Sequence, residues 1–434
     1  MRHLIILVVL AVAVATGPQL AAANYLIQPV LTWNDMALDT VRTERLGAFG
    51  AARLYAMVNV AMYDAVNGIN VANGWTDREE ALVSSDTAPS YVSRRAAAMA
   101  AAHAVLSALH PNLSGLYDPQ LAADLANLLG TPTFIEGGRQ WGESVGQQVV
   151  ALRANDGSSP SETQPGGSGP GEFRADWGSA QYRNMTPFAI NDPVDYFSAG
   201  PPALSSTEYA DALNEVKTLG NAAIPDTNKE EIFRFWRGGG GSARPPGEWI
   251  KVAMTVASNH SYTKFFLSRT VRLFALLGMA LGDSAVTSAD SKFAYHFWRP
   301  TTAIQNADTD GNAATVADPT WAPRNGSIGG SPEHTSGQST FAGAGSTILA
   351  GFFDDDTIAF TFEGDDAIAG PRTFSSFSAA AAEAGRARIF AGIHYEFSNQ
   401  AGQMAGRDLA AEILSTQLLS PSHDDYEDDE EDDS

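Results

Sequence analysis

Apolar residues that recur at helical spacing, with prolines and glycines between the runs, are the feature that most limits the folds open to this chain. Between residues 33 and 70 they return every three or four positions, which places them on one face of a helix. Alanine-rich segments at 94–109, 120–129 and 138–153 continue the pattern. No segment shows the alternation of a half-buried strand, so the sequence predicts an all-α fold. The periodic positions in the first segment are Leu54, Met57, Val58, Ala61 and Ala65.

A segment rich in Gly, Ser and Pro at 156–171 interrupts the helical pattern and predicts a surface loop. The chain has 434 residues, 44% of them hydrophobic, which is enough for a large core. We therefore expect an N-terminal helical region at 24–155 and a C-terminal helical region at 172–420. Within the second region, helices are expected at 207–220, 228–237, 249–281 and 341–352.

The first residues have the composition of a secretion signal. A basic start at 1–3 precedes an apolar run at 4–15, and small residues at 21–23 offer a cleavage site before Asn24. The apolar run is shorter than the ~20 residues that span a bilayer. We therefore expect a signal peptide at 1–23, a secreted or periplasmic mature protein and no stable membrane insertion.

Charge and cysteine content exclude several kinds of partner and chemistry. The formal net charge is −23, and nine acidic residues fall in the last eleven positions, which predicts a disordered tail at 421–434. An acidic chain argues against nucleic acid as a partner. Cysteine is absent, so thiol and cysteine–zinc chemistry are excluded. Any anion site must therefore be a local basic pocket.

Lys292 and Arg299 form the first of three basic or polar segments that point to such a pocket. They are seven positions apart, which on an ideal helix returns to nearly the same face, and Pro300 disfavours continuation of the helix. Aromatic neighbours at 293–298 suggest burial, which is costly for two cations unless an anion is present.

Ser336 and Gly337 form the second segment, directly before the helix expected at 341–352. Ser336 is a plausible N-cap. A helix N-terminus presents free N–H groups and the positive end of the helix dipole, so oxyanions bind there, and a glycine lets the backbone approach the ligand.

Arg388 and His394 form the third segment. Six positions correspond to about 120° around an ideal helix, so the two side chains converge only if the helix is interrupted, and Gly392 allows this. Arginine suits tetrahedral oxyanions, and a neutral imidazole suits metal ligation or nucleophilic attack.

The three segments, in this order and spacing, resemble the signature of the vanadium haloperoxidase and type 2 phosphatidic acid phosphatase superfamily. The resemblance extends over essentially the whole chain after residue 23 and is strongest to the bacterial haloperoxidase-like branch. Its further motifs are Trp33-Asn34, residues 53–67 with Tyr63-Asp64-Ala65, the run from Pro201 to Ser205, Phe235-Trp236 and the run from Tyr295 to Pro300.

The resemblance implies two helical bundles of the vanadium haloperoxidase type, with vanadate held between helices. It implies that Lys292, Arg299 and Arg388 neutralise the vanadate oxygens. Ser336 and the Gly337 N–H would hydrogen-bond them, and His394 would be the vanadium ligand. The expected partners are hydrogen peroxide with a halide or a small organic acceptor, and a homodimer is compatible with the sequence.

Gln338 departs from the family pattern, which has a histidine after Ser-Gly. Glutamine does not accept and return a proton near neutral pH, although it can donate a hydrogen bond to bound vanadate or peroxide. Proton transfer by a positioned group typically contributes ~10²–10⁴-fold to a rate. His334, four residues earlier, is the nearest candidate to replace the missing acid–base group.

Three functions therefore remain open. The first is a vanadate-dependent haloperoxidase that oxidises halide with hydrogen peroxide. The second is an acid-phosphatase-like hydrolase with His394 as nucleophile, which suffers more from the loss of a leaving-group acid at Gln338. The third is a non-catalytic oxyanion-binding protein that kept the basic pocket and lost the proton shuttle.

Overall fold

The computed structural model describes residues 18–76, 82, 86–366 and 368–419. Within these ranges the chain forms thirteen α-helices and two small two-stranded sheets, so the predicted all-α fold is confirmed. The N-terminal helices are α1 (Pro18–Glu44), α2 (Ala48–Ala72), α3 (Arg94–Leu109), α4 (Ser114–Ala126) and α5 (Pro132–Leu152). The later helices are α6 (Thr207–Leu219), α7 (Thr227–Phe235), α8 (Arg244–Ala257), α9 (Leu267–Tyr295), α10 (Pro300–Gln305), α11 (Gly337–Phe353), α12 (Phe377–Phe390) and α13 (Glu396–Thr416). The strands pair antiparallel as β1 (Thr163–Gln164) with β2 (Trp177–Gly178), and β3 (Phe360–Glu363) with β4 (Pro371–Phe374).

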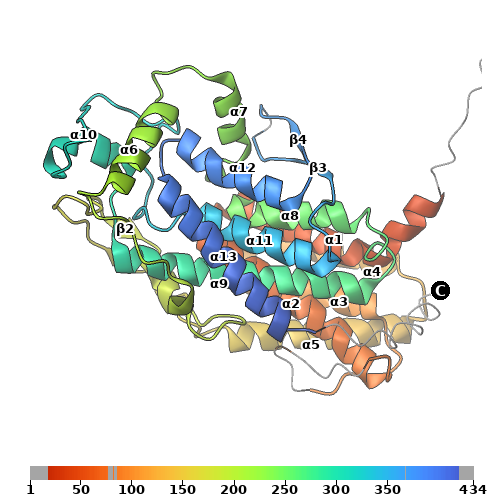
Figure 1. The fold of residues 1–434 in the computed structure, drawn as a ribbon. Coiled ribbons are helices and arrows are strands. Elements are labelled where there is room, and N and C mark those ends of the chain that lie inside the picture. Colours follow the sequence, from red (N-terminus) through yellow and green to blue (C-terminus); the bar gives the residue numbers. More distant parts are fainter. Residues whose placement is uncertain (1–17, 77–81, 83–85, 367, 420–434) are drawn as a thin grey trace, which may run out of the picture.

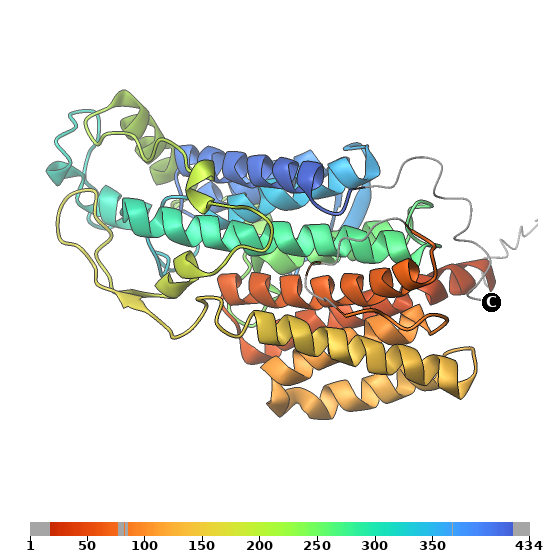
Figure 2. The ribbon, with the colours of Figure 1, turned by 90° about the horizontal axis from the view of Figure 1, so that it is seen from below.

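Helix α9 runs through the middle of the molecule. The N-terminal helices α2, α3 and α5 lie on one side of it, and α11, α12 and α13 lie on the other (Figures 1 and 2). In the described part of the chain, α9 alone is long and apolar enough to cross a membrane, but 94% of its apolar window is buried inside the protein.

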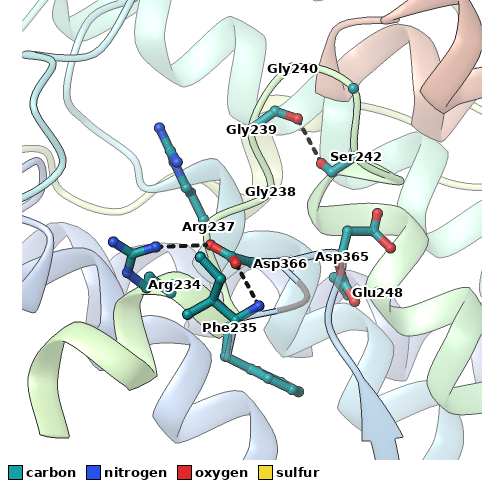
Figure 3. Close-up of a pocket in the computed structure, with 12 residues that line it drawn as sticks. Arg234, Phe235, Arg237, Gly238, Gly239, Gly240, Ser242, Glu248, Asp365 and Asp366 are labelled. Atoms are coloured by element: carbon teal, nitrogen blue, oxygen red, sulfur yellow. Dashed lines mark hydrogen bonds and ion pairs between the residues drawn. The ribbon is translucent and has the colours of Figure 1, made fainter. Parts of the chain in front are cut away.

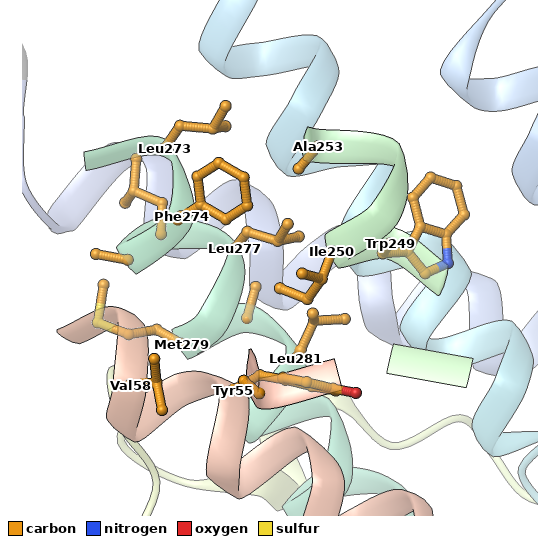
Figure 4. Close-up of a cluster of buried hydrophobic side chains, with 14 of the residues drawn as sticks. Tyr55, Val58, Trp249, Ile250, Ala253, Leu273, Phe274, Leu277, Met279 and Leu281 are labelled. Atoms are coloured by element: carbon orange, nitrogen blue, oxygen red, sulfur yellow. The ribbon is translucent and has the colours of Figure 1, made fainter. Parts of the chain in front are cut away.

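One hydrophobic core joins helices from both halves of the chain. Tyr55 and Val58 of α2 pack near Ile250 of α8 and Leu277 and Leu281 of α9, as Figure 4 shows. Each of these five residues is fully buried. Their burial is the main favourable term that holds α9 in place, and α9 in turn carries Lys292.

Helices α11 and α13 approach closely because glycines face the opposing backbone. A Cβ on Gly406 would lie 2.1 Å from the carbonyl oxygen of Thr340, and one on Gly402 would lie 2.6 Å from that of Ser336. Any larger residue would push the helices apart. This contact fixes the N-terminus of α11, where Ser336 and Gly337 lie, against α13.

Three expectations about secondary structure were incomplete. The helix expected at 33–70 is two helices, because the chain turns at Arg45, which has φ +53°, before α2 begins. The segment expected as helix at 249–281 also breaks between α8 and α9. The β3–β4 hairpin was missed: β3 alternates buried and exposed residues, but over only four positions.

Two predictions lie wholly or mainly outside the described residues. The predicted signal peptide falls mostly on 1–17, and the acidic tail falls within 420–434. Both remain predictions from the sequence.

Candidate functional site

Lys292 lies in the last turn of α9 and is 3% exposed. Its Nζ donates to the carbonyl oxygens of Pro332 at 2.7 Å and Glu333 at 3.1 Å. Burial, followed by the charge of Arg299, lowers the pKa of Lys292 well below its usual value, and the charge of Glu333 opposes this shift. The ammonium group thus joins α9 to the segment that leads into α11.

Arg299 also lies beside this segment, but it belongs to the chain between α9 and α10 and not to the helix that carries Lys292. The expectation that it shares a helix face with Lys292 is wrong, because α9 ends at Tyr295 and His296 takes a left-handed conformation, with φ +46°. Arg299 precedes α10 in extended backbone. Its Nε donates to Ser331 O at 2.8 Å, and its Nη1 donates to Ile393 O at 2.8 Å and contacts His394 Nε2 at 3.0 Å.

His394 lies in the break between α12 and α13, where Gly392 has φ +78°. Its Nδ1 is 2.7 Å from Glu333 Oε1, which also accepts from the Tyr395 N–H at 3.1 Å. Burial, and then the charge of Arg299, lowers the pKa of His394 well below its usual value, so the imidazole is neutral.

These contacts define the tautomer of His394. The guanidinium of Arg299 can only donate, so Nε2 of His394 must be the acceptor and carries a lone pair. A neutral imidazole then carries its proton on Nδ1, which donates to Glu333. The arrangement directs an unprotonated nitrogen toward Arg299.

Ser336 is the N-cap of α11, as predicted, and is fully buried. Its Oγ accepts from the N–H of Ser339 at 3.4 Å and from the Ser339 hydroxyl at 2.9 Å. Gly337 begins the helix, and a Cβ there would lie 2.9 Å from Ser288 Oγ. Ser288 stands one turn before Lys292 on α9, so the N-terminus of α11 lies beside the Lys292 end of that helix.

Gln338 and Arg388 meet at one backbone oxygen. The carbonyl of Trp236 accepts from Gln338 Nε2 at 2.8 Å and from Arg388 Nη1 at 3.5 Å. Two further atoms, Gln338 Oε1 and Arg388 Nε, are buried and have no hydrogen-bond partner among the residues that the structure describes. The two side chains are therefore neighbours with unused polar capacity.

The cations of this site are poorly compensated by protein charge. Burial lowers the pKa of Arg299 to about 10 and, together with the charge of Arg299, lowers the pKa of Arg388 to about 9. Burial also raises the pKa of Glu333 to about 7, although Arg299 and Lys292 oppose this. Lys292 and Arg299 thus share one carboxyl group, Glu333, that is itself reluctant to ionise, and Arg388 adds a third charge that lowers the pKa of Lys292. This arrangement favours an anionic ligand.

We call Lys292, Arg299, Arg388, Ser336, Gly337 and His394 the oxyanion cage. Its chemistry fits vanadate or phosphate: guanidinium, ammonium and helix N–H donors for oxygens, and one imidazole lone pair for the central atom. The unpartnered Nε of Arg388 is the observation that most directly calls for an added acceptor.

His334 lies next to the cage without a hydrogen bond to the cage residues among those described. Its Nε2 is 2.8 Å from Ser198 Oγ, and its ring packs against Tyr295 and Phe397. Burial, and then the charge of Lys292, lowers the pKa of His334 to about 3. Near neutral pH the ring is therefore uncharged and a weak base.

A separate cavity of about 360 Å³ is lined by none of the predicted site residues. Figure 3 shows Arg234 paired with Asp366 on one side and Glu248 near Asp365 on the other, below the glycine loop that follows Arg237. The wall includes both neighbours of Trp236. Arg234, Glu248, Asp365 and Asp366 already have ion-pair partners, whereas Arg237 has none among the described residues. Because most of the charges of this cavity are paired and it holds none of the predicted site residues, we place the chemistry in the oxyanion cage.

Sequence reasoning missed two residues of the site. Glu333 orients His394 from 61 positions away, so no local pattern connects the two. Trp236 contributes only its carbonyl oxygen, a group that every residue carries. Phe235-Trp236 was noticed as a family motif, which was the single available signal.

Comparison with known proteins supports the predicted resemblance. Residues 272–419 match the sequence model of the VCPO second helical-bundle domain. Vanadium chloroperoxidase of Curvularia inaequalis is 24% identical over 177 residues, which are 35% of this chain and 28% of that protein. The match thus spans less than a third of that relative's length.

Solved structures extend the likeness to the fold of most of the chain. The first bacterial vanadium-dependent iodoperoxidase superposes with a TM-score of 0.76 at 21% identity, covering 91% of this chain and 98% of that one. Apo-type bacterial vanadium-dependent chloroperoxidase superposes with a TM-score of 0.61 at 15% identity, covering 85% and 94%. The predicted superfamily resemblance and helical-bundle fold are confirmed.

Proposed function

We propose that this protein is a vanadate-dependent peroxidase that oxidises a halide, or a small organic acceptor, with hydrogen peroxide after export from the cytoplasm. The main supporting observation is the charge imbalance of the oxyanion cage, where three buried cations are accompanied, among the described residues, by the single carboxyl group of Glu333. Vanadate bound there would supply a Lewis-acid centre at which hydrogen peroxide is activated toward the halide.

His394 and Glu333 act as a unit in this proposal. Glu333 holds the proton on Nδ1 of His394, which keeps the Nε2 lone pair available as the vanadium ligand. In the ligand-free protein, Arg299 Nη1 donates to this same nitrogen. A ligand bound to Nε2 would replace that hydrogen bond, and Arg299 could then donate to an oxygen of the oxyanion.

The remaining cage residues stabilise negative charge. Arg299 and Lys292 are held by backbone carbonyls, so their positions are set before a ligand arrives. Arg388 has a buried Nε–H without a partner among the described residues, and Ser336 Oγ lies 2.9 Å from the Ser339 hydroxyl, which also donates to Asn399 Oδ1 at 2.8 Å. The buried setting excludes water and strengthens each of these contacts.

The described residues of the site are poorly suited to proton transfer near neutral pH. Gln338 cannot exchange a proton near neutral pH, and the pKa of His334 is lowered to about 3. Slow turnover is therefore expected, with anion binding better preserved than catalysis.

The decisive experiment is reconstitution of the protein, without residues 1–23, with orthovanadate. Vanadate binding is measured by calorimetry, and bromide and iodide oxidation are assayed beside phosphate-ester hydrolysis. We expect slow halide oxidation that depends on vanadate, and Gln338→His should raise it about ten-fold or more by restoring a general acid–base group. His334→Ala lowers it if His334 is the substitute.

The same experiment separates the alternatives. Ester hydrolysis without vanadate, abolished in His394→Ala, would favour the phosphatase-like reading. Micromolar binding of vanadate or phosphate, with no oxidation even in Gln338→His, would favour a non-catalytic oxyanion-binding protein.

A further inference from the structure

Apart from the lone pair of His394, the oxyanion cage offers mainly hydrogen-bond donors, and the side-chain oxygen of the neighbouring Gln338 is a buried acceptor. Gln338 is the second residue of α11 and is only 6% exposed. Its Oε1 has no hydrogen-bond partner within the described part of the chain. An acceptor buried without a donor is costly, so it points to a group that the protein does not itself supply.

The orientation of the Gln338 amide follows from its neighbours. Nε2 donates to the carbonyl oxygen of Trp236 at 2.8 Å. Rotating the amide by 180° would set Oε1 against that oxygen, two acceptors in contact, so the carbonyl side must face the other way.

A second unpartnered atom belongs to Arg388, the side chain that neighbours Gln338. Arg388 shares the Trp236 carbonyl with Gln338, at 3.5 Å from Nη1, and its buried Nε–H has no acceptor. A ligand that satisfies both atoms must offer an acceptor to Arg388 and a donor to Gln338. An oxyanion that carries an O–H group has both, whereas a fully deprotonated oxyanion has acceptors only.

We infer that Gln338 makes the oxyanion cage selective for protonated oxyanions, with its Oε1 accepting a hydrogen bond from the O–H of the ligand. Hydrogen phosphate, arsenate and vanadate carry such a proton near neutral pH, and sulfate carries none. Sulfate would place an oxygen lone pair against Oε1 or leave Oε1 unsatisfied. This inference rests on the proposed oxyanion site and assigns Gln338 a role in specificity that does not require proton exchange.

The test compares the affinities of two tetrahedral anions of similar shape. Inorganic phosphate and sulfate are titrated into the ligand-free protein at pH 7.5, with binding measured by calorimetry and by the shift of the melting temperature. We expect phosphate to bind at least ten-fold more tightly than sulfate. In Gln338→Leu the ratio should fall toward one, because the acceptor is gone.

Two further variants make the result specific. Gln338→Glu keeps an acceptor in place and adds charge, so both anions should weaken while phosphate stays preferred. Gln181→Leu removes another buried glutamine, whose Oε1 accepts from the Glu162 N–H at 3.0 Å, and should leave the ratio unchanged.

The experiment distinguishes a wrong role for Gln338 from a wrong assignment of the oxyanion site. If neither anion binds the unmodified protein, the oxyanion site itself is refuted. Should both bind with equal affinity, or should Gln338→Leu keep the original ratio while folding normally, the site stands and the role of Gln338 is overturned.

Discussion

Two groups of charged side chains in this protein, one partly buried and one fully buried, differ in how their charges are compensated. In the first, which we call the ion cluster, Asp365 pairs with Arg42 at 2.8 Å and with Lys251 at 3.1 Å, and Lys251 pairs with Glu248 at 3.2 Å. Burial alone would raise the pKa of Asp365, but the hydrogen bond from Arg42 and the charge of Lys251 outweigh it and lower that pKa to about 2.

The oxyanion cage shows the opposite pattern. There, burial lowers the pKa values of all three cations, and the charge of Arg299 adds to the shift for Lys292 and Arg388, so each charged form is disfavoured by its surroundings. The charges of the ion cluster are compensated by partners within the folded chain, whereas the cations of the cage are compensated only in part and would need an added anion. We propose on this basis that the ion cluster supports the fold and that the oxyanion cage binds a ligand.

The largest expected effect comes from removing the single lone-pair donor of the cage. His394→Ala should lower vanadate-dependent halide oxidation by ~10³-fold or more and abolish vanadate retention, because no other cage residue can replace the imidazole. Calorimetry with orthovanadate measures retention. His103→Ala is the matched control, since His103 also pairs with a carboxylate, Asp118, but at the surface. Retention of vanadate by His394→Ala at the original affinity would contradict the assignment.

Replacing Arg388 tests most directly whether the oxyanion cage serves anion binding rather than the stability of the fold. Arg388→Met should weaken phosphate or vanadate binding by about 100-fold, a loss of ~2.7 kcal/mol, because a charge-assisted donor is removed. The ligand-free protein should melt at the same temperature or higher, because a buried cation without a matching anion is gone. A lower melting temperature together with intact binding would show that Arg388 supports the fold instead.

Breaking the ion cluster should give the reverse result. Asp365→Asn leaves Arg42 and Lys251 without their main partner and should destabilise the fold by ~2–3 kcal/mol, between the values typical of buried and surface pairs. Anion affinity should not change. Asp39→Asn is the control, because Asp39 also pairs with Arg42 but its side chain is 61% exposed. Denaturant titration compares the two, and equal effects would argue against a special role for Asp365.

Local features of the site could be predicted from the sequence, and long-range ones could not. The Ser336 cap and the break at Gly392 depend on a few neighbouring residues, so the pattern of residues was sufficient for both. The bounds of α3 were also predicted, from composition and flanking residues. By contrast, the left-handed turn at His296 overrides the regular spacing between Lys292 and Arg299. The Glu333–His394 contact depends on tertiary packing, which one sequence does not show.

The smallest expected effect tests whether both carboxyl groups of the ion cluster are ionised in the folded protein. Two carboxyl groups, Asp365 and Glu248, share Lys251, and Glu248 is the more deeply buried, at 2% exposed. Burial raises the pKa of Glu248 from 4.5 to about 7, because Lys251 compensates only part of the desolvation cost. The folded chain therefore binds this proton more tightly than the unfolded chain does.

The sign of the pH dependence follows from this difference. The stabilising contribution of protonated Glu248 is fully present below pH 4.5 and is lost as pH rises through about 7. Between pH 5 and pH 7 this amounts to ~2 kcal/mol for one such group. Glu248→Gln mimics the protonated form, so its stability relative to the unmodified protein should rise by about that amount over the same interval. Glu143→Gln, which alters an exposed glutamate on α5, is the control and should show no such trend. A constant difference between Glu248→Gln and the unmodified protein at every pH would mean that Lys251 keeps both carboxylates ionised, and the ion cluster would then be balanced throughout.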